Sequence, residues 1–328
     1  MTVPTTMLAA YVTALGPPDA IQYGSLPVPV TGPTDALVEI EATVVNPVDA
    51  LVRSGRFATR TPFPFVIGRD LVGRVAAVGE GADHRVGDRV WCNSLGHDGR
   101  QGTFSEYAVV PTDRLYRVPH GVDPTTALAV AHPAATAYLA WFEHAGLQPG
   151  ETVYVGGAAG NVGRAALAMA KNAGARVIAS AHGTDRDRCQ DDGADAVVDY
   201  SDSELASSIN AVAPGGVDVF WDTSGRQPLS LALETTATRG RVVVTAAGSG
   251  EQRIPTSALY TRDISLHGFV ISRASVRELA DAASWVNALL ADGVLDARIT
   301  DEMALSAAVE AHARIEAGDV RGRLIVRP

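Results

Sequence analysis

The chain has 328 residues, of which 46% are hydrophobic and 20% charged, a balance that indicates a globular protein of two domains or one large one. Its net charge of −10 disfavours nucleic acid or an anionic membrane surface as a partner, because both attract clustered Lys and Arg. Two cysteines are too few for a disulfide framework and no secretion leader is evident, so a reducing cytoplasm is expected. No apolar run reaches the roughly 18 residues that span a bilayer.

Short strand-like runs separated by Gly and Pro dominate roughly the first 125 residues. Turn signals such as Thr31-Gly32-Pro33 and Val86-Gly87-Asp88 lie between them. The pattern predicts a compact, mostly β, barrel-like domain. The runs cover residues 36–40, 71–78, 89–92, 104–110 and 114–118.

Strand and helix patterns alternate after a helical stretch that begins near Pro124. Such alternation predicts a doubly wound parallel sheet, which makes the chain α/β. The expected strands are residues 153–155, 177–179, 196–198, 217–221, 241–245 and 264–270, and the expected helices are 162–173, 205–212, 229–236 and 276–290. A last strand at residues 322–326 is expected to return to the first domain.

A glycine-rich segment follows the first of these strands and opens the first helix. In such a turn, backbone N–H groups approach a pyrophosphate at a helix N-terminus, where peptide dipoles favour negative charge. The fingerprint is imperfect, because alanine occupies the first glycine position, and an ordinary strand-to-helix turn remains the alternative. The expected cofactor-binding residues of the segment are Ala158, Ala159, Gly160, Asn161, Val162 and Gly163.

The end of the second strand favours NADP(H) over NAD(H). NAD sites usually place an acidic residue about 20 positions after the glycines, where it binds the ribose 2′-hydroxyl. Here Ser180 is followed by Ala181 and His182, and Arg186 and Arg188 come next. A hydroxyl and guanidinium groups can bind a 2′-phosphate that a carboxylate would repel. The alternative is that both arginines belong to a solvated helix start whose own acids neutralise them.

Further motifs, together with the glycine segment, extend over nearly the whole chain. They are Asn46-Pro47-Val48-Asp49, Arg53-Ser54-Gly55, Ile67-Gly68-Arg69-Asp70, Gly73-Arg74-Val75, Gly87-Asp88-Arg89-Val90, Gly102-Thr103-Phe104-Ser105-Glu106-Tyr107, Thr136-Ala137-Tyr138 and Gly322-Arg323. With them the chain resembles the zinc-independent quinone oxidoreductase branch of the medium-chain dehydrogenase/reductase superfamily, the branch that includes zeta-crystallin.

This resemblance implies a GroES-like, mostly β catalytic domain at residues 1–127 and 273–328. A Rossmann dinucleotide-binding domain with a doubly wound parallel sheet would occupy residues 128–272. The family also implies a homodimer. Further cofactor contacts are expected at Ala247, Phe269 and Arg323.

The resemblance also implies that no zinc is bound. Where zinc alcohol dehydrogenases of the superfamily have a cysteine ligand, this chain has Asn46, and where they have Gly-His-Glu it has Gly68-Arg69-Asp70. His132 falls near the third ligand position. An amide, a guanidinium and one imidazole cannot form a tetrahedral zinc site, because Arg has no lone pair to offer.

Without a Lewis acid, the expected chemistry is hydride transfer from NADPH to an acceptor that is already electrophilic, a quinone or an α,β-unsaturated carbonyl. In the family, Asn46 would donate to the substrate oxygen and Thr136 would face the nicotinamide. The proton would come from Asp49, from Tyr138, or directly from solvent. The acceptor would lie against Leu51, Phe57 and Tyr138. Since Leu51 and Phe57 replace tyrosines of the bacterial quinone reductases, this pocket should be more apolar.

Two other functions remain open at this point. An enoyl or enone reductase, including one for a thioester of specialised metabolism, would share every motif above. A structural or RNA-binding role of the crystallin kind would not need the glycine segment, and an RNA-binding surface would need a basic stripe.

Overall fold

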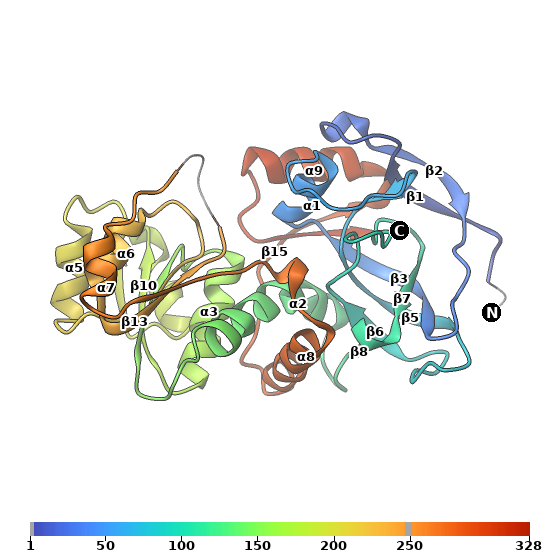
Figure 1. Cartoon of the computed structure of the whole chain (residues 1–328). Coiled ribbons are helices and arrows are strands. Elements are labelled where there is room, and N and C mark those ends of the chain that lie inside the picture. Colours follow the sequence, from blue (N-terminus) through green and yellow to red (C-terminus); the bar gives the residue numbers. More distant parts are fainter. Residues whose placement is uncertain (1–2, 247–250) are drawn as a thin grey trace. The chain divides into compact units, whose positions relative to one another are not determined.

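The computed structural model describes residues 3–246 and 251–328, and these form two compact units (Figure 1). The first unit comprises Met1–His132 and Leu279–Pro328, and the second comprises Pro133–Glu278. The expected boundaries, after residues 127 and 272, fall several residues earlier along the chain. Helices α2 (Pro124–Tyr138) and α8 (Val276–Ala291) each contain one of the observed boundaries.

The first unit consists of two sheets and two helices of its own. The smaller sheet has the order β2-β1-β4, and the larger has the order β15-β16-β3-β5-β6-β8, with β7 also paired to β3. The smaller sheet contains β1 (Thr6–Val12), β2 (Gln22–Pro27) and β4 (Phe65–Val66). The larger contains β3 (Asp35–Val44), β5 (Asp70–Val78), β6 (Arg89–Cys92), β7 (Tyr107–Pro111), β8 (Tyr116–Arg117), β15 (Ile299–Ala304) and β16 (Arg323–Arg327). The helices are α1 (Pro47–Arg53) and α9 (Ala308–Ala317).

The C-terminal strand returns to the first unit, as the sequence predicted. Ile325 of β16 pairs antiparallel with Val44 of β3, while β15 runs parallel along the other edge of β16. Val326 and Leu324 are fully buried in the same apolar cluster as Phe65 and Phe104. The last residues of the chain therefore help to form the core of the unit that the first 132 residues begin.

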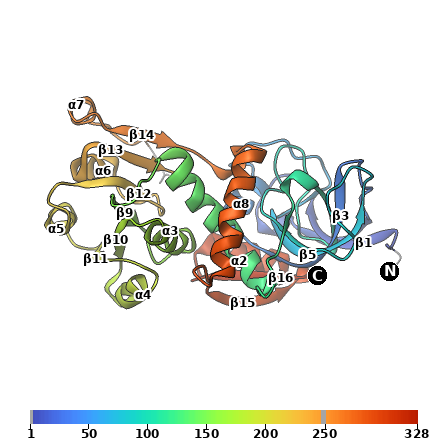
Figure 2. The same cartoon turned by 90° about the horizontal axis from the view of Figure 1, so that it is seen from below.

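The second unit is built on a six-stranded parallel sheet of order β11-β10-β9-β12-β13-β14. Its strands are β9 (Thr152–Gly156), β10 (Arg176–Ala181), β11 (Ala196–Asp199), β12 (Val217–Asp222), β13 (Thr236–Val244) and β14 (Ser265–Gly268). Its helices are α3 (Asn161–Asn172), α4 (Arg186–Asp191), α5 (Leu205–Val212), α6 (Leu229–Thr235) and α7 (Thr256–Tyr260). Helix α3 lies on one side of the sheet, and α5 and α6 lie on the other (Figures 1 and 2).

The strand order of this sheet reverses between β9 and β12. From β9 the chain first adds β10 and β11 on one side, and then crosses to add β12, β13 and β14 on the other. In open parallel sheets, ligands bind at the carboxyl ends of the strands where this reversal occurs. Among the described residues, no helix combines the length and apolar character needed to cross a membrane.

Candidate active site and cofactor cradle

The turn between β9 and α3 lies at this reversal and contains the glycine-rich segment. Gly157 has a φ of +65°, a conformation that side chains rarely adopt. A Cβ on Gly163 would lie 2.4 Å from the Gly157 carbonyl oxygen and 2.6 Å from that of Ala158, so only glycine lets α3 pack this closely on the turn. Gly160 is the N-cap of α3 and has no side chain to cover the helix N-terminus. The segment thus forms a backbone cradle suited to an anionic pyrophosphate.

Side chains at the end of β12 hold this cradle in place, and the sequence analysis did not identify them. Thr223 donates to the Gly156 carbonyl at 2.8 Å. The Asp222 carboxylate accepts from the backbone N–H groups of Ser224 at 3.0 Å and Gln227 at 2.8 Å. These bonds close the loop after β12 against the end of β9. Asp222 ends a buried strand, and Thr223 and Ser224 directly follow it. Polar residues at the carboxyl end of a buried parallel strand are the sequence signal that could have identified these side chains.

At the end of β10, the structure buries one expected residue and exposes others. Ser180 is fully buried, and its hydroxyl lies 3.3 Å from Gln227 Nε2, an amide nitrogen that also donates to Tyr154 at 2.8 Å. The exposed group at the strand end is His182, whose Nδ1 lies 3.0 Å from the Thr184 hydroxyl. A 2′-phosphate at this edge would therefore meet His182 before Ser180.

Two arginines and one acid complete this edge. Arg186 is exposed and Arg188 is partly exposed, and among the described residues neither forms an ion pair. Asp199, at the end of β11, accepts from the Ser201 hydroxyl and N–H, and these bonds hold the pKa of its carboxyl below the usual value. A Cβ on Gly183 would lie 3.4 Å from Asp199 Oδ2, so a negative charge adjoins the β10 edge from the neighbouring strand. The sequence analysis did not consider this acid.

The remaining expected residues of the second unit lie on α2 and at the end of β14. Thr136 is 8% exposed, and Tyr138 packs on Phe142 with ring centroids 5.2 Å apart. Phe269 is stacked on His144 with centroids 4.3 Å apart, and burial lowers the pKa of that imidazole. Ala247 lies outside the described residues.

The first unit contains a buried network of charges around Asn46. Asn46 is 2% exposed and is the N-cap residue of α1. Its Nδ2 donates to Asp70 at 2.8 Å, and its Oδ1 accepts from Arg323 Nη2 at 3.0 Å. Arg323 Nη2 also lies 3.7 Å from the Asp70 carboxylate. The expected cofactor residue Arg323, itself 3% exposed, thus has its guanidinium bound inside this unit.

Asp49, Arg69 and His132 extend this network. The Asp49 carboxylate accepts from the Asn46 N–H at 2.8 Å and lies 3.5 Å from Arg69 Nε. Burial raises the pKa of Asp49 to about 6, against the opposing effect of the Arg69 charge. His132 Nδ1 lies 3.3 Å from Asp70 Oδ1. The structure therefore brings the expected residues Asn46 and Asp49 together with the Arg69-Asp70 pair, His132 and Arg323.

The expected acceptor residues of this unit adjoin α1. Leu51 lies on α1, and its carbonyl accepts from the Phe57 N–H at 2.9 Å. The Phe57 ring lies 5.8 Å from the imidazole of His97. Both side chains are partly buried, so the surface they form beside the helix is largely apolar.

Two family models match the chain: "Alcohol dehydrogenase GroES-like domain" at residues 32–120 and "Zinc-binding dehydrogenase" at residues 161–287. The human protein named quinone oxidoreductase is 28% identical over 326 residues, which are 98% of this chain and 97% of that one. The chain belongs to the quinone oxidoreductase branch of the medium-chain dehydrogenase/reductase superfamily. Its α/β fold, GroES-like plus Rossmann, is the one that the sequence predicted.

Solved structures of this superfamily match the fold along almost the whole chain. An NAD-dependent alcohol dehydrogenase superposes with a TM-score of 0.88 at 29% identity, covering 98% of this chain and all of that one. A mycobacterial protein solved as a complex with NADPH superposes with a TM-score of 0.85 at 27% identity, with the same coverage. This member of the superfamily is an oxidoreductase that uses a nicotinamide cofactor.

Proposed function

We propose that the chain is an NADPH-dependent, zinc-independent reductase that transfers hydride to a quinone or a related α,β-unsaturated carbonyl. The buried network of Asn46, Asp70 and Arg323 is the observation that carries this proposal. Asn46 and Asp70 of this network lie where the zinc alcohol dehydrogenases of the superfamily have zinc-ligand segments, and here an amide and a carboxylate bind the Arg323 guanidinium. The substrate would therefore be one that needs no metal to polarise it.

The side chains at this place do not fit a zinc ion, although one matching family model is described as zinc-binding. Asn46 has both ends of its amide engaged, by Asp70 and by Arg323. A cation beside the Arg69 and Arg323 guanidiniums would be repelled, and neither side chain has a lone pair to offer. No group of three or more His, Cys, Asp or Glu side chains suited to a metal occurs among the described residues. Elemental analysis of the purified protein should find far less than one zinc per chain, and one tightly held zinc would refute this part.

The residues of the second unit fit a dinucleotide. Bound nicotinamide cofactor supplies the hydride, and the cradle from Gly157 to Gly163 offers backbone N–H groups to its pyrophosphate. At the β10 edge, His182, Arg186 and Arg188 would bind a 2′-phosphate. Asp199 acts against this preference, because its charge adjoins the same edge and would favour a ribose 2′-hydroxyl.

The cofactor preference has a direct test in two single variants. Arg186→Ala should weaken NADPH binding by about 1–2 kcal/mol, roughly a five- to thirtyfold rise in Kd, and leave NADH binding unchanged. Asp199→Asn should change the NADPH-to-NADH preference in the opposite direction, toward NADPH. If Arg186→Ala weakens both cofactors equally, the arginine supports the loop and does not bind the phosphate. If the wild-type protein binds NADH more tightly, the proposed preference is wrong.

The first unit would orient the acceptor. Asn46 Nδ2 carries two hydrogens, and the structure commits one of them to Asp70, so a second remains to donate to a substrate oxygen. Asp49, whose pKa is raised to about 6, is protonated below that pH and can then deliver a proton. Within this unit we assign Leu51 and Phe57 to the acceptor. Taken by itself, the second unit contributes Thr136, which we assign to the nicotinamide, and Tyr138, which we assign to the acceptor.

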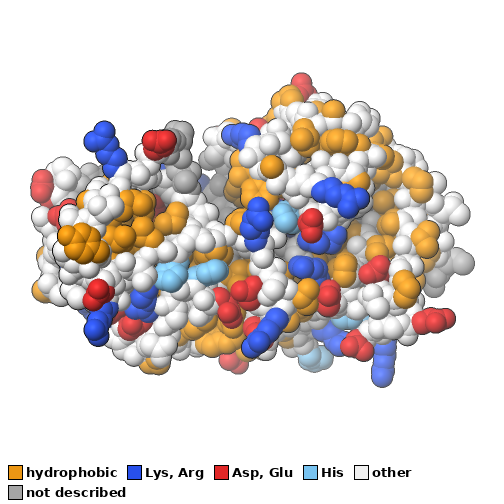
Figure 3. Space-filling view, in the orientation of Figure 1, with side chains coloured by type: hydrophobic (Ala, Val, Ile, Leu, Met, Phe, Trp, Pro, Cys, Tyr) orange, Lys and Arg blue, Asp and Glu red, His pale blue; other side chains and the backbone are white. Residues whose placement is uncertain are grey.

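The competing functions differ in what a purified sample should do. An enone or enoyl reductase would bind NADPH and reduce a vinyl ketone or a crotonyl thioester while leaving quinones intact. A crystallin-like structural or RNA-binding protein would turn over none of these. On the face drawn in Figure 3, acidic side chains lie among the basic ones. We further propose a homodimer, which light scattering of the eluted peak would test.

A further inference from the structure

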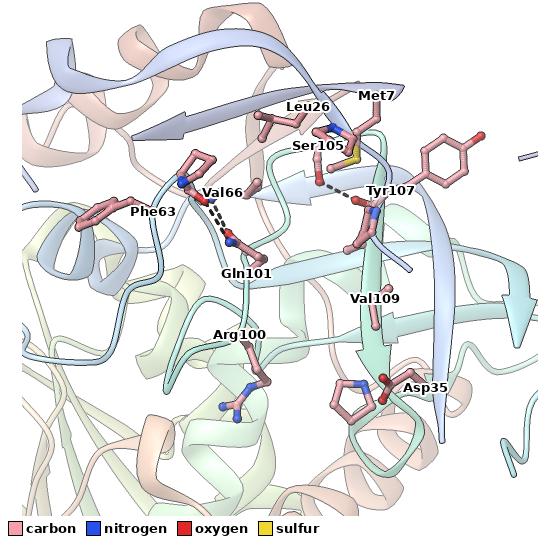
Figure 4. A pocket seen from close by; sticks show the side chains of 16 residues that line it. Met7, Leu26, Asp35, Phe63, Val66, Arg100, Gln101, Ser105, Tyr107 and Val109 are labelled. Carbon is pink, nitrogen blue, oxygen red and sulfur yellow. Dashed lines mark hydrogen bonds between the residues drawn. The ribbon is translucent and has the colours of Figure 1, made fainter. Parts of the chain in front are cut away.

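A pocket of about 470 Å³ lies within the first unit (Figure 4). It is formed by β1, β2 and β4 of the smaller sheet together with β7 of the larger one. Its volume is within the usual range for sites that hold small molecules. None of Asn46, Asp49, Leu51 and Phe57 lines it.

The wall of this pocket is mostly apolar. Met7, Leu26, Phe63, Val66 and Val109 line it, together with four prolines. In Figure 4 Leu26 and Met7 lie at one end, and Arg100 and Asp35 lie toward the other. Val109 contributes to this wall, whereas the next residue, Val110, belongs to the core of the larger sheet, as the alternation of a strand requires.

Most polar groups in the wall are already satisfied by the protein. The Gln101 side chain accepts from the Val66 N–H at 2.7 Å and donates to the carbonyls of Pro64 at 3.0 Å and Pro62 at 3.3 Å. The Ser105 hydroxyl donates to the Tyr107 carbonyl at 2.8 Å. These groups stabilise the pocket but offer little to a ligand.

Arg100 is the exception. Its Nε donates to the Ser94 carbonyl at 3.3 Å, and no carboxylate lies within ion-pair distance of it among the described residues. Burial lowers the pKa of this guanidinium; the charge of Arg114 acts in the same direction, and the charge of Asp98 opposes it. The carboxylate of Asp35, in contrast, already accepts from the Gly32 N–H at 3.2 Å.

We propose that this pocket is a second ligand site, which binds a small molecule with an apolar body and one carboxylate. The apolar body would displace water from the wall between Leu26 and Val109, and the carboxylate would bind the free Nη1 and Nη2 groups of Arg100. The site is separate from the reductase site, and occupancy of one does not require the other.

Three probes that share one body and differ in their head group test the proposal by calorimetry on the full chain. They are 4-phenylbutyrate, 4-phenylbutan-1-ol and 4-phenylbutylamine. The acid should bind about fivefold more tightly than the alcohol, since the guanidinium is only partly desolvated, and the amine should bind most weakly. Saturating NADPH should leave the Kd of the acid unchanged. If the amine binds most tightly, Asp35 and not Arg100 binds the head group, and the proposed carboxylate ligand is wrong. If no probe binds at millimolar concentration, the pocket is not a ligand site.

Two variants place the binding within the pocket. Val109→Phe should fill the pocket and abolish probe binding. The matched control Val86→Phe, at a valine that is 66% exposed, should leave probe binding unchanged. Arg100→Gln should make the acid and the alcohol bind equally, whereas Arg85→Gln, at an exposed arginine that does not line the pocket, should preserve their difference. Binding that survives Val109→Phe, or a preference for the acid that survives Arg100→Gln, would overturn the proposal. If Val109→Phe does not fold, Arg100→Gln alone tests the proposal, because a preference for the acid that survives this substitution overturns it.

Discussion

Removing the Arg323 guanidinium should destabilise the first unit strongly. Among the described residues, Arg323→Met leaves the Asp70 carboxylate, which is 0% exposed, with Asn46 Nδ2 at 2.8 Å and His132 Nδ1 at 3.3 Å. Breaking a buried pair by removing one partner costs about 3–5 kcal/mol, because the remaining charge is not compensated. Asp70→Asn should cost a similar amount, since it isolates the Arg323 charge. The double variant removes both charges and should cost less than the sum of the two by about 2–3 kcal/mol.

Urea unfolding followed by tryptophan fluorescence measures this coupling. Of the four tryptophans, Trp91 and Trp285 lie in the first unit, so replacing Trp141 and Trp221 by Phe confines the signal to that unit. Additive costs of the two single variants would show that the residues do not interact. An unchanged midpoint for Arg323→Met, combined with weaker NADPH binding, would show instead that Arg323 is the cofactor contact that the sequence predicted.

Three further predictions concern the cradle, the core and the proton supply. Gly163→Ala should weaken NADPH binding more than tenfold, about 1.4 kcal/mol or more. Gly160→Ala should be tolerated, since the added Cβ would meet only one atom, at 3.2 Å. If the two variants raise the Kd equally, the glycine turn does not bind the cofactor as described. Burial lowers the pKa of His312 to about 3, whereas the same imidazole in the unfolded chain binds a proton near pH 6.5. Because the unfolded state is protonated first, the free energy of unfolding should fall by up to about 4–5 kcal/mol as the pH drops from about 6.5 to about 3. His312→Phe should flatten this fall in a urea titration, and an unchanged acid profile would show that the imidazole is not the cause. Quinone reduction should slow as pH rises through about 6, where Asp49 ionises, and Asp49→Asn should lose that dependence; a wild-type rate that is flat across this range would remove Asp49 from the reaction.

The parts of the fold that the sequence predicted well are those set by local pattern. The glycine segment predicted the turn at β9 because Gly157 and Gly163 are positions where a Cβ would collide with backbone. The return of the last strand was also correct, since the apolar run of β16 had to pair with a sheet. Strands β1 and β2 were not predicted, because alanines, a glycine and polar residues take the place of the β-branched runs that reveal strands.

The site residues were harder to predict, because burial and pairing between distant segments decide their roles. Ser180 looks available in the sequence, yet Gln227 from another strand end covers it. Arg323 lies 277 positions from Asn46, so no local pattern could show that the two side chains bond. Asp199 adjoins the edge of a neighbouring strand and therefore escaped a search along the second strand alone.

The account's central claim is most directly tested by following the loss of nicotinamide absorbance with 1,4-benzoquinone, 9,10-phenanthrenequinone, an alkyl vinyl ketone and a crotonyl thioester as acceptors. NADPH and NADH would be compared in parallel, on protein dialysed against a chelator and assayed for zinc. We expect NADPH to be oxidised faster than NADH, at least one quinone to be reduced, and the chelator to have no effect. Turnover that requires zinc, or an absence of turnover with every acceptor, would contradict the claim.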